Sequence, residues 1–179
     1  EYKLDKHWRG SRSGFMSFGL VQLGQAATSL GDGDIAYECI QHLVNRFWLN
    51  NLASMHNHRT LFNMDISGGM PAVLIKMLVA SDPGKIKLLP ALPSKWAKGS
   101  VEGVLCRGQV EVKSLQWDSG RIIVSLISGK DQQVLLQAPS TIRNISILKG
   151  NTRIEHGENE MSRNISLAGG EEIKLEIEL

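Results

Sequence analysis

The chain has 179 residues, which is enough for one domain or two small ones with a real core. Its 20 basic and 18 acidic residues are scattered without a basic block, which argues against a nucleic-acid partner. No apolar run approaches the length of a membrane span. Two cysteines, Cys39 and Cys106, are too few and too far apart for a disulfide framework or a zinc site. We expect both to be small buried residues, and we expect no cofactor.

Before residue 83 the apolar residues recur with helical spacing. Residues 14–30 are apolar on several sides and predict a buried helix. Residues 34–47 predict an amphipathic, half-exposed helix with Asp34 at its N-cap. Residues 70–81 predict a third helix that is again buried. This order of buried, half-exposed and buried helices is expected when helical hairpins form the two concentric layers of an α/α toroid.

After Asp82-Pro83-Gly84 the apolar residues alternate with polar ones, which is typical of strands. A change of phase predicts a β-bulge near Lys113 and Ser114, and Asp118-Ser119-Gly120 predicts a hairpin turn. Many short strands separated by turns predict an antiparallel β-sandwich. The expected strands cover residues 85–89, 109–117, 121–127, 134–137, 144–148, 152–156, 163–167 and 173–179. We therefore expect an α+β chain with a helical domain at residues 1–83 and a sandwich domain at residues 84–179.

One stretch, residues 61–78, combines a lone carboxylate with a helix start. Asp65 lies among apolar neighbours, where a carboxylate is costly to bury unless it is hydrogen-bonded. Pro71 predicts that a helix begins near residue 70, and the preceding Gly68-Gly69 pair permits a tight turn or close approach to a ligand. The helix N-terminus would favour a charged Asp65. Two interpretations stay open: Asp65 is a catalytic acid or base, or Asp65 or Ser67 merely caps the helix.

The loop at residues 50–65 is rich in side chains that can hold a polar ligand. His56 and His58 with Asp65 suggest metal ligands, but no third site at a recognised spacing supports them, so we expect no metal. Residues 31–34 are similar to the start of a calcium loop, although a helix break explains them better. Asn144 and Asn164 each begin an Asn-Ile-Ser glycosylation motif, which is short and frequent by chance.

Several motifs together resemble glycoside hydrolase family 95, and the resemblance covers nearly the whole chain. The most distinctive is LLPALP followed by Trp96. The others are SLGDGDIAY at residues 29–37, Asn51-Leu52 with a nearby His56, FNMD at residues 62–65, GKIK at 84–87, GSV at 99–101 and Arg107-Gly108.

The resemblance implies the end of an (α/α)6 barrel followed by a C-terminal β domain, and an inverting α-L-fucosidase or a relative that acts on α-L-galactosides. It implies that Asp65 is the general base and that His56, Asn51 and Ser67 contact the substrate. The general acid of the family lies upstream of the residues present here, so we expect the isolated chain to be inactive. Where the family has Gly-Asn-Phe-Gly-Gly after the Asp, this chain has Ile-Ser-Gly-Gly-Met at residues 66–70, which changes the shape beside the base.

The expected partners are an oligosaccharide or glycan and the upstream domains of a parent protein, which we expect to be secreted or periplasmic. The chain begins at Glu1 without an initiator Met, so a missing signal peptide says nothing about location. One alternative is a non-catalytic carbohydrate-binding or interaction module, which needs exposed aromatic residues on a sheet face. The expected strands supply Trp117 and almost no other. Another is a helical scaffold in which Asp65 is only a cap.

Overall fold

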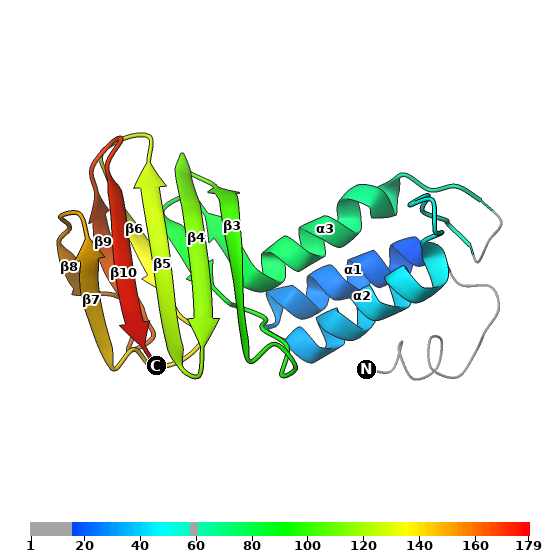
Figure 1. Cartoon of the computed structure of the whole chain (residues 1–179), viewed down its shortest axis with the longest axis horizontal. Coiled ribbons are helices and arrows are strands. Elements are labelled where there is room, and N and C mark those ends of the chain that lie inside the picture. Colours follow the sequence, from blue (N-terminus) through cyan, green and yellow to red (C-terminus); the bar gives the residue numbers. More distant parts are fainter. Residues whose placement is uncertain (1–15, 58–60) are drawn as a thin grey trace. The chain divides into compact units, whose positions relative to one another are not determined.

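The structure is a computed structural model that describes residues 16–57 and 61–179 (Figure 1). In these residues three helices are followed by ten strands. The chain divides into two compact units. We name them the helical unit, described residues 16–57 and 61–77 with Ala91–Pro93, and the β unit, residues Leu78–Pro90 with Ser94–Leu179. The α+β class with a C-terminal sandwich is confirmed, whereas the division of a parent protein into domains at residue 83 stays a prediction.

The helical unit consists of α1 (Ser17–Ser29), α2 (Gly33–Phe47) and α3 (Asp65–Leu78). The N-cap of α2 is Asp32 and not the predicted Asp34, because its carboxylate accepts a hydrogen bond from the Ile35 N–H at 3.0 Å. The turn between α1 and α2 is therefore a helix break and cap. This confirms the interpretation of residues 31–34 as a helix break. The fully buried side chains that centre this unit include Leu20, Leu43, Ile66, Val73 and Met77.

Helix α3 begins at Asp65 rather than near residue 70, so the prediction of its start was wrong. Pro71 lies inside the helix, although it lacks the N–H that would continue the hydrogen-bond ladder. The glycine pair is also helical, and a Cβ on Gly69 would lie 2.6 Å from the Val21 side chain of α1. The glycine thus lets α1 and α3 approach closely, which is packing within the unit and not a turn toward a ligand.

The end of α3 corrects a second prediction. The helix stops at Leu78, and the residues expected to complete it form strand β1 (Val79–Asp82). This strand pairs antiparallel with β2 (Lys85–Leu88) across a tight turn in which Gly84 has a φ of 77°. The pairing decides the conformation of these residues, because an apolar helical pattern of four residues also suits a buried strand.

Two five-stranded sheets form the β unit. One has the order β1-β2-β6-β9-β8 and the other β3-β4-β5-β10-β7. All neighbours are antiparallel except β2 and β6, whose parallel pairing the sequence did not predict. The remaining bounds are β3 Lys98–Cys106, β4 Val110–Asp118, β5 Arg121–Ser128, β6 Gln132–Gln137, β7 Asn144–Lys149, β8 Ile154–His156, β9 Ser162–Leu167 and β10 Glu172–Glu178.

Two local predictions in the β unit are confirmed. The register between β4 and β5 shifts between Val112 and Ser114, which is the expected bulge. Ser119 and Gly120 have φ values of 46° and 84°, as a two-residue hairpin turn between these strands requires. Residues 113–179 contain strands and turns and no long helix.

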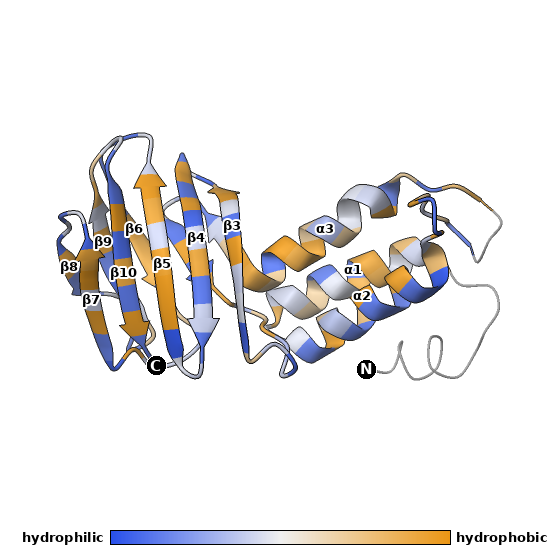
Figure 2. Cartoon of the chain, in the orientation of Figure 1, coloured by the Kyte–Doolittle hydropathy of each residue, from blue (hydrophilic) through white to orange (hydrophobic). Residues whose placement is uncertain are grey.

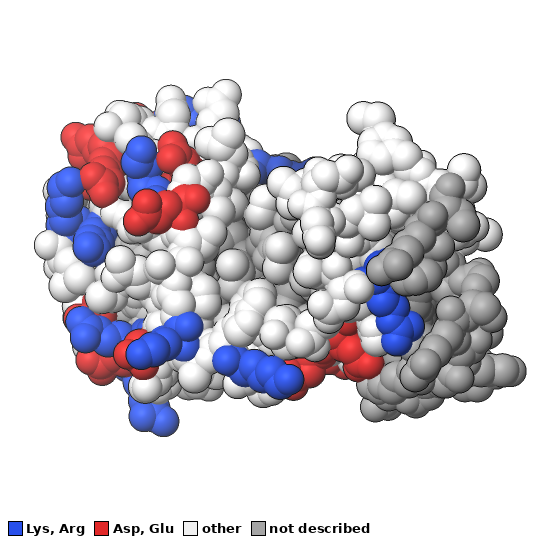
Figure 3. Space-filling model, turned by 45° about the vertical axis from the view of Figure 1, so that its right-hand side comes forward, with Lys and Arg blue, Asp and Glu red and all other residues white. Residues whose placement is uncertain are grey.

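The surfaces of the units differ in character. In the β unit hydrophilic and hydrophobic residues alternate along β4 and β10, whereas long stretches of α1 and α3 are apolar or neutral (Figure 2). Acidic and basic side chains are interspersed on the β unit, and the described part of the helical unit shows fewer charges in this view (Figure 3). Among the described residues no helix has the length and hydropathy needed to span a membrane.

Candidate active site

The candidate site lies where the loop before α3 meets the first turn of that helix. Two isolated β-bridges, between Trp48 and Ser54 and between Met55 and Phe62, shape this loop. The Asn63 N–H donates to the Ser54 carbonyl at 2.9 Å, and the His56 N–H donates to the Leu61 carbonyl at 2.6 Å. The loop is therefore held by its own backbone hydrogen bonds.

Asn63 is the centre of the site, and its side chain is buried. Its Oδ1 accepts a hydrogen bond from the Asp65 N–H at 2.6 Å, which satisfies the first free amide of α3. This bond fixes the orientation of the amide, so Nδ2 is the atom that lies 2.8 Å from His56 Nδ1. Because Nδ2 can only donate, His56 Nδ1 must accept, and the proton of the neutral imidazole lies on Nε2. Asn63 thus positions both Asp65 and the Nε2–H donor of His56.

A second pair of side chains, Ser54 and Ser67, completes the hydrogen-bond network around Asn63. The hydroxyl of Ser54, which is fully buried, donates to the Asn63 carbonyl and lies 2.7 Å from Ser67 Oγ. Since the single proton of Ser54 is used on the carbonyl, the hydroxyl of Ser67 is the donor in the second bond. The side chain of Ser67 is exposed on the first turn of α3, and its oxygen keeps lone pairs for another donor.

Asp65 is the first residue of α3, and its side chain is exposed. The expectation of a carboxylate buried among apolar neighbours is therefore wrong for Asp65. Its neighbours Phe62 and Met64 are themselves 62% and 73% exposed, so the carboxylate is not surrounded by apolar atoms. The cap is supplied by Asn63, which frees the Asp65 carboxylate from that role. What remains is an accessible carboxylate on a helix end that a partly buried hydrogen-bond network holds in place.

The other residues singled out in the sequence are placed differently. Asn51 is exposed, and its Oδ1 accepts a hydrogen bond from the Ala53 N–H at 3.1 Å within its own turn. The hydrogen bonds that join His56, Ser67 and the Asp65 backbone do not extend to it in the described part of the chain. His58 lies outside the described residues. No group of three potential metal ligands exists among the residues that the structure describes.

Sequence reasoning missed two members of the network, Ser54 and Asn63. Asn63 carried a recognisable signal, because an Asn two residues before a helix commonly accepts its first amides. The displaced prediction of the helix start hid that signal. Ser54 had no local signal, since its role depends on a bridge to residues nine positions away.

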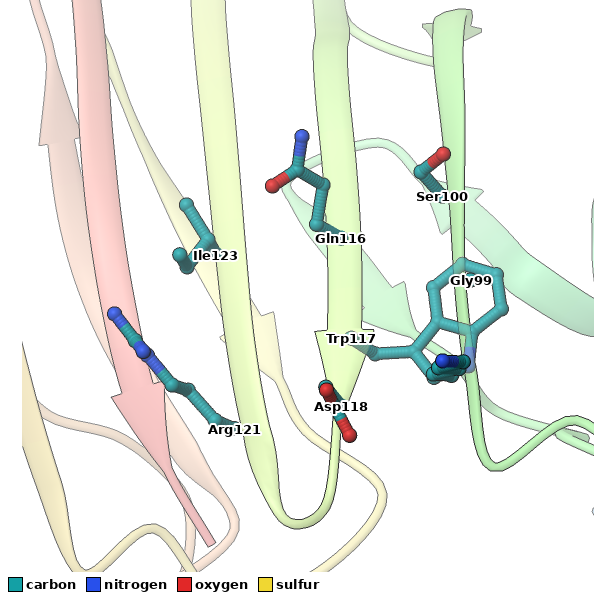
Figure 4. A pocket seen from close by; sticks show the side chains of 8 residues that line it. Gly99, Ser100, Gln116, Trp117, Asp118, Arg121 and Ile123 are labelled. Carbon is teal, nitrogen blue, oxygen red and sulfur yellow. The ribbon is translucent and has the colours of Figure 1, made fainter.

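A second feature is an open cleft of about 520 Å³ lined by residues of β3, β4 and β5 (Figure 4). It lies within the β unit, whereas the network around Asn63 lies within the helical unit. Two rows of cross-strand partners line it, Lys98 with Asp118 and Arg121, and Ser100 with Gln116 and Ile123. The guanidinium of Arg121 is already paired with Glu176.

The cleft lacks the stacking platform that the binding-module alternative needs. Trp117 is only 8% exposed, and its Nε1–H donates to the Trp96 carbonyl at 2.9 Å. Its ring occupies the space in which a Cβ on Gly99 would lie. The indole is therefore used for packing and for one backbone hydrogen bond, so the structure does not favour carbohydrate stacking here.

Neither cysteine has the character of a nucleophile. Burial raises the pKa of the Cys39 thiol to about 12, and burial also raises the pKa of Cys106. A thiol that stays protonated is a poor nucleophile and a poor metal ligand. Cys39 is buried as expected, whereas Cys106 is partly exposed.

Comparisons with known proteins give three findings. The family profile "Glycoside hydrolase family 95, C-terminal domain" matches residues 80–175, which is slightly more than half of the chain. A curated relative, Alpha-L-fucosidase 2 of Arabidopsis thaliana, is 41% identical over 63 residues, which are 35% of this chain and 7% of the relative. Among solved structures, a glycoside hydrolase family 30 subfamily 8 xylanase from Clostridium acetobutylicum covers 94% of this chain and 41% of its own, with a TM-score of 0.37 and 12% identity. A likeness as weak as the last bears on neither fold nor activity.

Proposed function

The chain belongs to glycoside hydrolase family 95, and from that premise we propose that it carries the general base of an inverting, exo-acting glycosidase that removes terminal α-L-fucosides or related α-L-galactosides from glycans. The general base is Asp65. Family membership identifies the chain as part of a glycoside hydrolase. The sugar, the stereochemical course and the role of each residue are the content of the proposal.

The observation that carries the proposal is the exposed carboxylate of Asp65 on a helix end that hydrogen bonds hold, in the same network as His56 and Ser67. A general base must reach a water molecule, and an exposed carboxylate does so. The network through Asn63 fixes the backbone at Asp65 and directs the free proton of His56 to Nε2. His56 Nε2–H as donor and Ser67 Oγ as acceptor suit sugar hydroxyls, which both donate and accept. We assign Asn51 a more peripheral substrate contact from the adjoining turn.

Inverting hydrolysis assigns the steps as follows. Asp65 takes a proton from water, and the water oxygen attacks the anomeric carbon from the face opposite the leaving group. The glycosidic C–O bond breaks, and a separate carboxylic acid gives its proton to the leaving oxygen. The two carboxyl groups stand roughly 6.5–9.5 Å apart in such enzymes. We assign the acid to the barrel residues of a parent protein, in which α1, α2 and α3 are the last helices.

The identity of the sugar depends on the residues after the base. Ser67, at the second position of the segment that departs from the family pattern, is tied to Ser54. The Ser67 hydroxyl is therefore oriented by its hydrogen bond to Ser54, and it presents the sugar with an oxygen in a fixed position. Turnover of a panel of aryl α-L-fucosides and α-L-galactosides by the parent enzyme identifies the preferred sugar. We expect the isolated chain to hydrolyse none of them, because we assign the acid to other barrel residues of the parent.

The test is Asp65→Asn in the parent enzyme. The amide keeps the shape but loses the basicity, so turnover should fall by about 10²–10⁴-fold with little change in substrate affinity. Asp82→Asn is the matched control, since Asp82 is an exposed aspartate at the end of β1 in the other unit, and it should leave kcat unchanged. Near-normal kcat with a lowered melting temperature for Asp65→Asn would reduce Asp65 to a structural residue.

We also propose that the parent acts outside the cytoplasm, in a secreted or periplasmic location. The support is the expected substrate, a terminal sugar on a glycan. Fractionation of cells that make the parent, with an activity assay on each fraction, tests this proposal. Activity confined to the cytoplasm would contradict it.

A further inference from the structure

The two Asn-Ile-Ser motifs are identical in sequence but lie in different surroundings. The first runs from Asn144 to Ser146 in β7, and the second from Asn164 to Ser166 in β9. Attachment of a glycan needs an asparagine whose side chain is on the surface and whose surroundings leave room for a bulky polar group. The structure separates the motifs by this criterion.

Asn144 begins the last strand of its sheet. Strand β7 pairs with β10 on one side and has no strand on the other side within the described residues. The side chain of Asn144 is exposed, and β7 is exposed or half-exposed along its length. Asn144 Nδ2 lies 3.5 Å from Ser146 Oγ, at the limit of a hydrogen bond, so the amide and the hydroxyl of the motif already face each other.

Asn164 lies on an interior strand of its sheet. Strand β9 lies between β6 and β8, where Asn164 pairs in register with Leu135 on one side and Glu155 on the other. Its side chain is half-buried, and Nδ2 donates to the His156 carbonyl at 2.9 Å. A glycan on this nitrogen would replace one of its two protons and would have to fit against the backbone of β8, to which the amide is hydrogen-bonded.

We propose that Asn144 is an N-glycosylation site and that Asn164 is not. The donor is a lipid pyrophosphate-linked oligosaccharide. A bond forms between Asn144 Nδ2 and the anomeric carbon of the first sugar, while the bond from that carbon to the pyrophosphate oxygen breaks. The lipid pyrophosphate leaves with the electron pair, and the amide loses one proton. The proposal rests on a secretory location, which is part of the function proposed above.

A glycan at this position also suits the fold. An exposed edge strand presents unpaired backbone groups on which a strand of another chain can pair. The large side chains of Ile147 and Leu148 in β7 are 44% and 48% exposed. A bulky, hydrated group on Asn144 would obstruct pairing along this edge.

To test this, the whole chain is expressed in a eukaryotic cell line with a secretory leader. The leader brings the chain into the secretory pathway, where N-glycosylation takes place, whatever its native location. The secreted protein is treated with peptide-N-glycosidase, which shifts its mobility and converts a glycosylated Asn to Asp. We expect one glycan on the wild type, mapped to Asn144 by that conversion. Asn144→Gln and Ser146→Ala should lose the glycan, and Asn164→Gln and Ser166→Ala should keep it.

Several results would overturn the proposal: an unmodified wild type, a glycan mapped to Asn164, or a glycan that survives Asn144→Gln. Peptide mapping of the wild type decides the question even if a variant fails to be secreted. The result is independent of Asp65, because glycosylation is read by mass and not by turnover. Loss of the proposed hydrolase activity would therefore leave this test unaffected.

Discussion

The two units differ in how completely they bury their apolar side chains. The β unit encloses its core between two five-stranded sheets, with fully buried residues such as Leu115, Leu126 and Ile177. In the helical unit many large apolar side chains stay exposed. Of the twelve such side chains in the described residues, nine belong to the helical unit: Met16, Phe18, Leu30, Val44, Leu52, Leu61, Phe62, Met64 and Ile75.

This difference indicates which contacts stabilise each unit. A sandwich of alternating strands has one apolar face per sheet, and two such faces cover each other. Helices that are apolar on several sides need neighbours on more than one side. Large exposed apolar surface is typical of an interaction face. The comparison therefore supports the proposal that further helices of a barrel cover the helical unit in the parent.

The largest expected effect on stability is that of Gly33→Ala. A Cβ there would lie 2.5 Å from the Ala91 carbonyl oxygen and 2.6 Å from the Leu92 carbonyl carbon, which are backbone atoms that cannot move aside easily. We expect the free energy of unfolding of the helical unit to fall by about 1–3 kcal/mol. Amide hydrogen exchange should accelerate in α2 and stay unchanged in β5.

Gly68→Ala is the matched control for that substitution. Gly68 is also helical, and nothing lies within 4 Å of the position of its Cβ. Alanine should stabilise α3 by about 0.5–1 kcal/mol, because glycine loses more conformational freedom in a helix. Equal amide-exchange protection factors in α2 for the two variants would show that the close approach of residues 91–92 to Gly33 does not contribute to stability.

A second test concerns the exposed apolar surface itself. We expect the purified chain to self-associate, and Phe62→Thr with Met64→Gln to weaken that association at least about tenfold, because the two side chains lose apolar burial. Light scattering over a range of concentrations measures the effect. Leu105→Gln removes an 81% exposed side chain from the β unit and should change nothing. A wild-type chain that stays monomeric at high concentration would contradict the interpretation of this surface.

The smallest effect is a pH dependence in the β unit. Hydrogen bonds from Lys149 and Ser125 lower the pKa of Glu172 from its ordinary value of 4.5. A lowered folded-state pKa stabilises the protein above 4.5 and loses that contribution as pH falls through the lowered value. Glu172→Gln should thus lower Tm slightly at pH 7, and the difference should vanish in acid. A Tm difference between Glu172→Gln and the wild type that is as large in acid as at pH 7 would contradict this assignment.

The sequence by itself determined the features that depend on neighbouring residues. The change from helical to alternating periodicity separates the helices from the strands, because each period reflects which side chains of one element share a face. The bulge after Val112 and the hairpin at Ser119-Gly120 were predictable, since both follow from local phase and turn chemistry. The motifs that resemble family 95 also lie in the sequence alone, and the family match agrees with them.

Only the tertiary structure decided the features that depend on distant residues. The antiparallel pairing of β1 with β2 overrides a helical pattern, and β2 joins β6 in parallel although some fifty residues separate them. At the candidate site, Asp65 was identified in the sequence, but the residue that positions it was not. Asn63 gains its role because Ser54 and His56 reach it from the other side of a loop. Such hydrogen bonds leave no periodic trace, since they join residues that no single helix or strand brings onto one face.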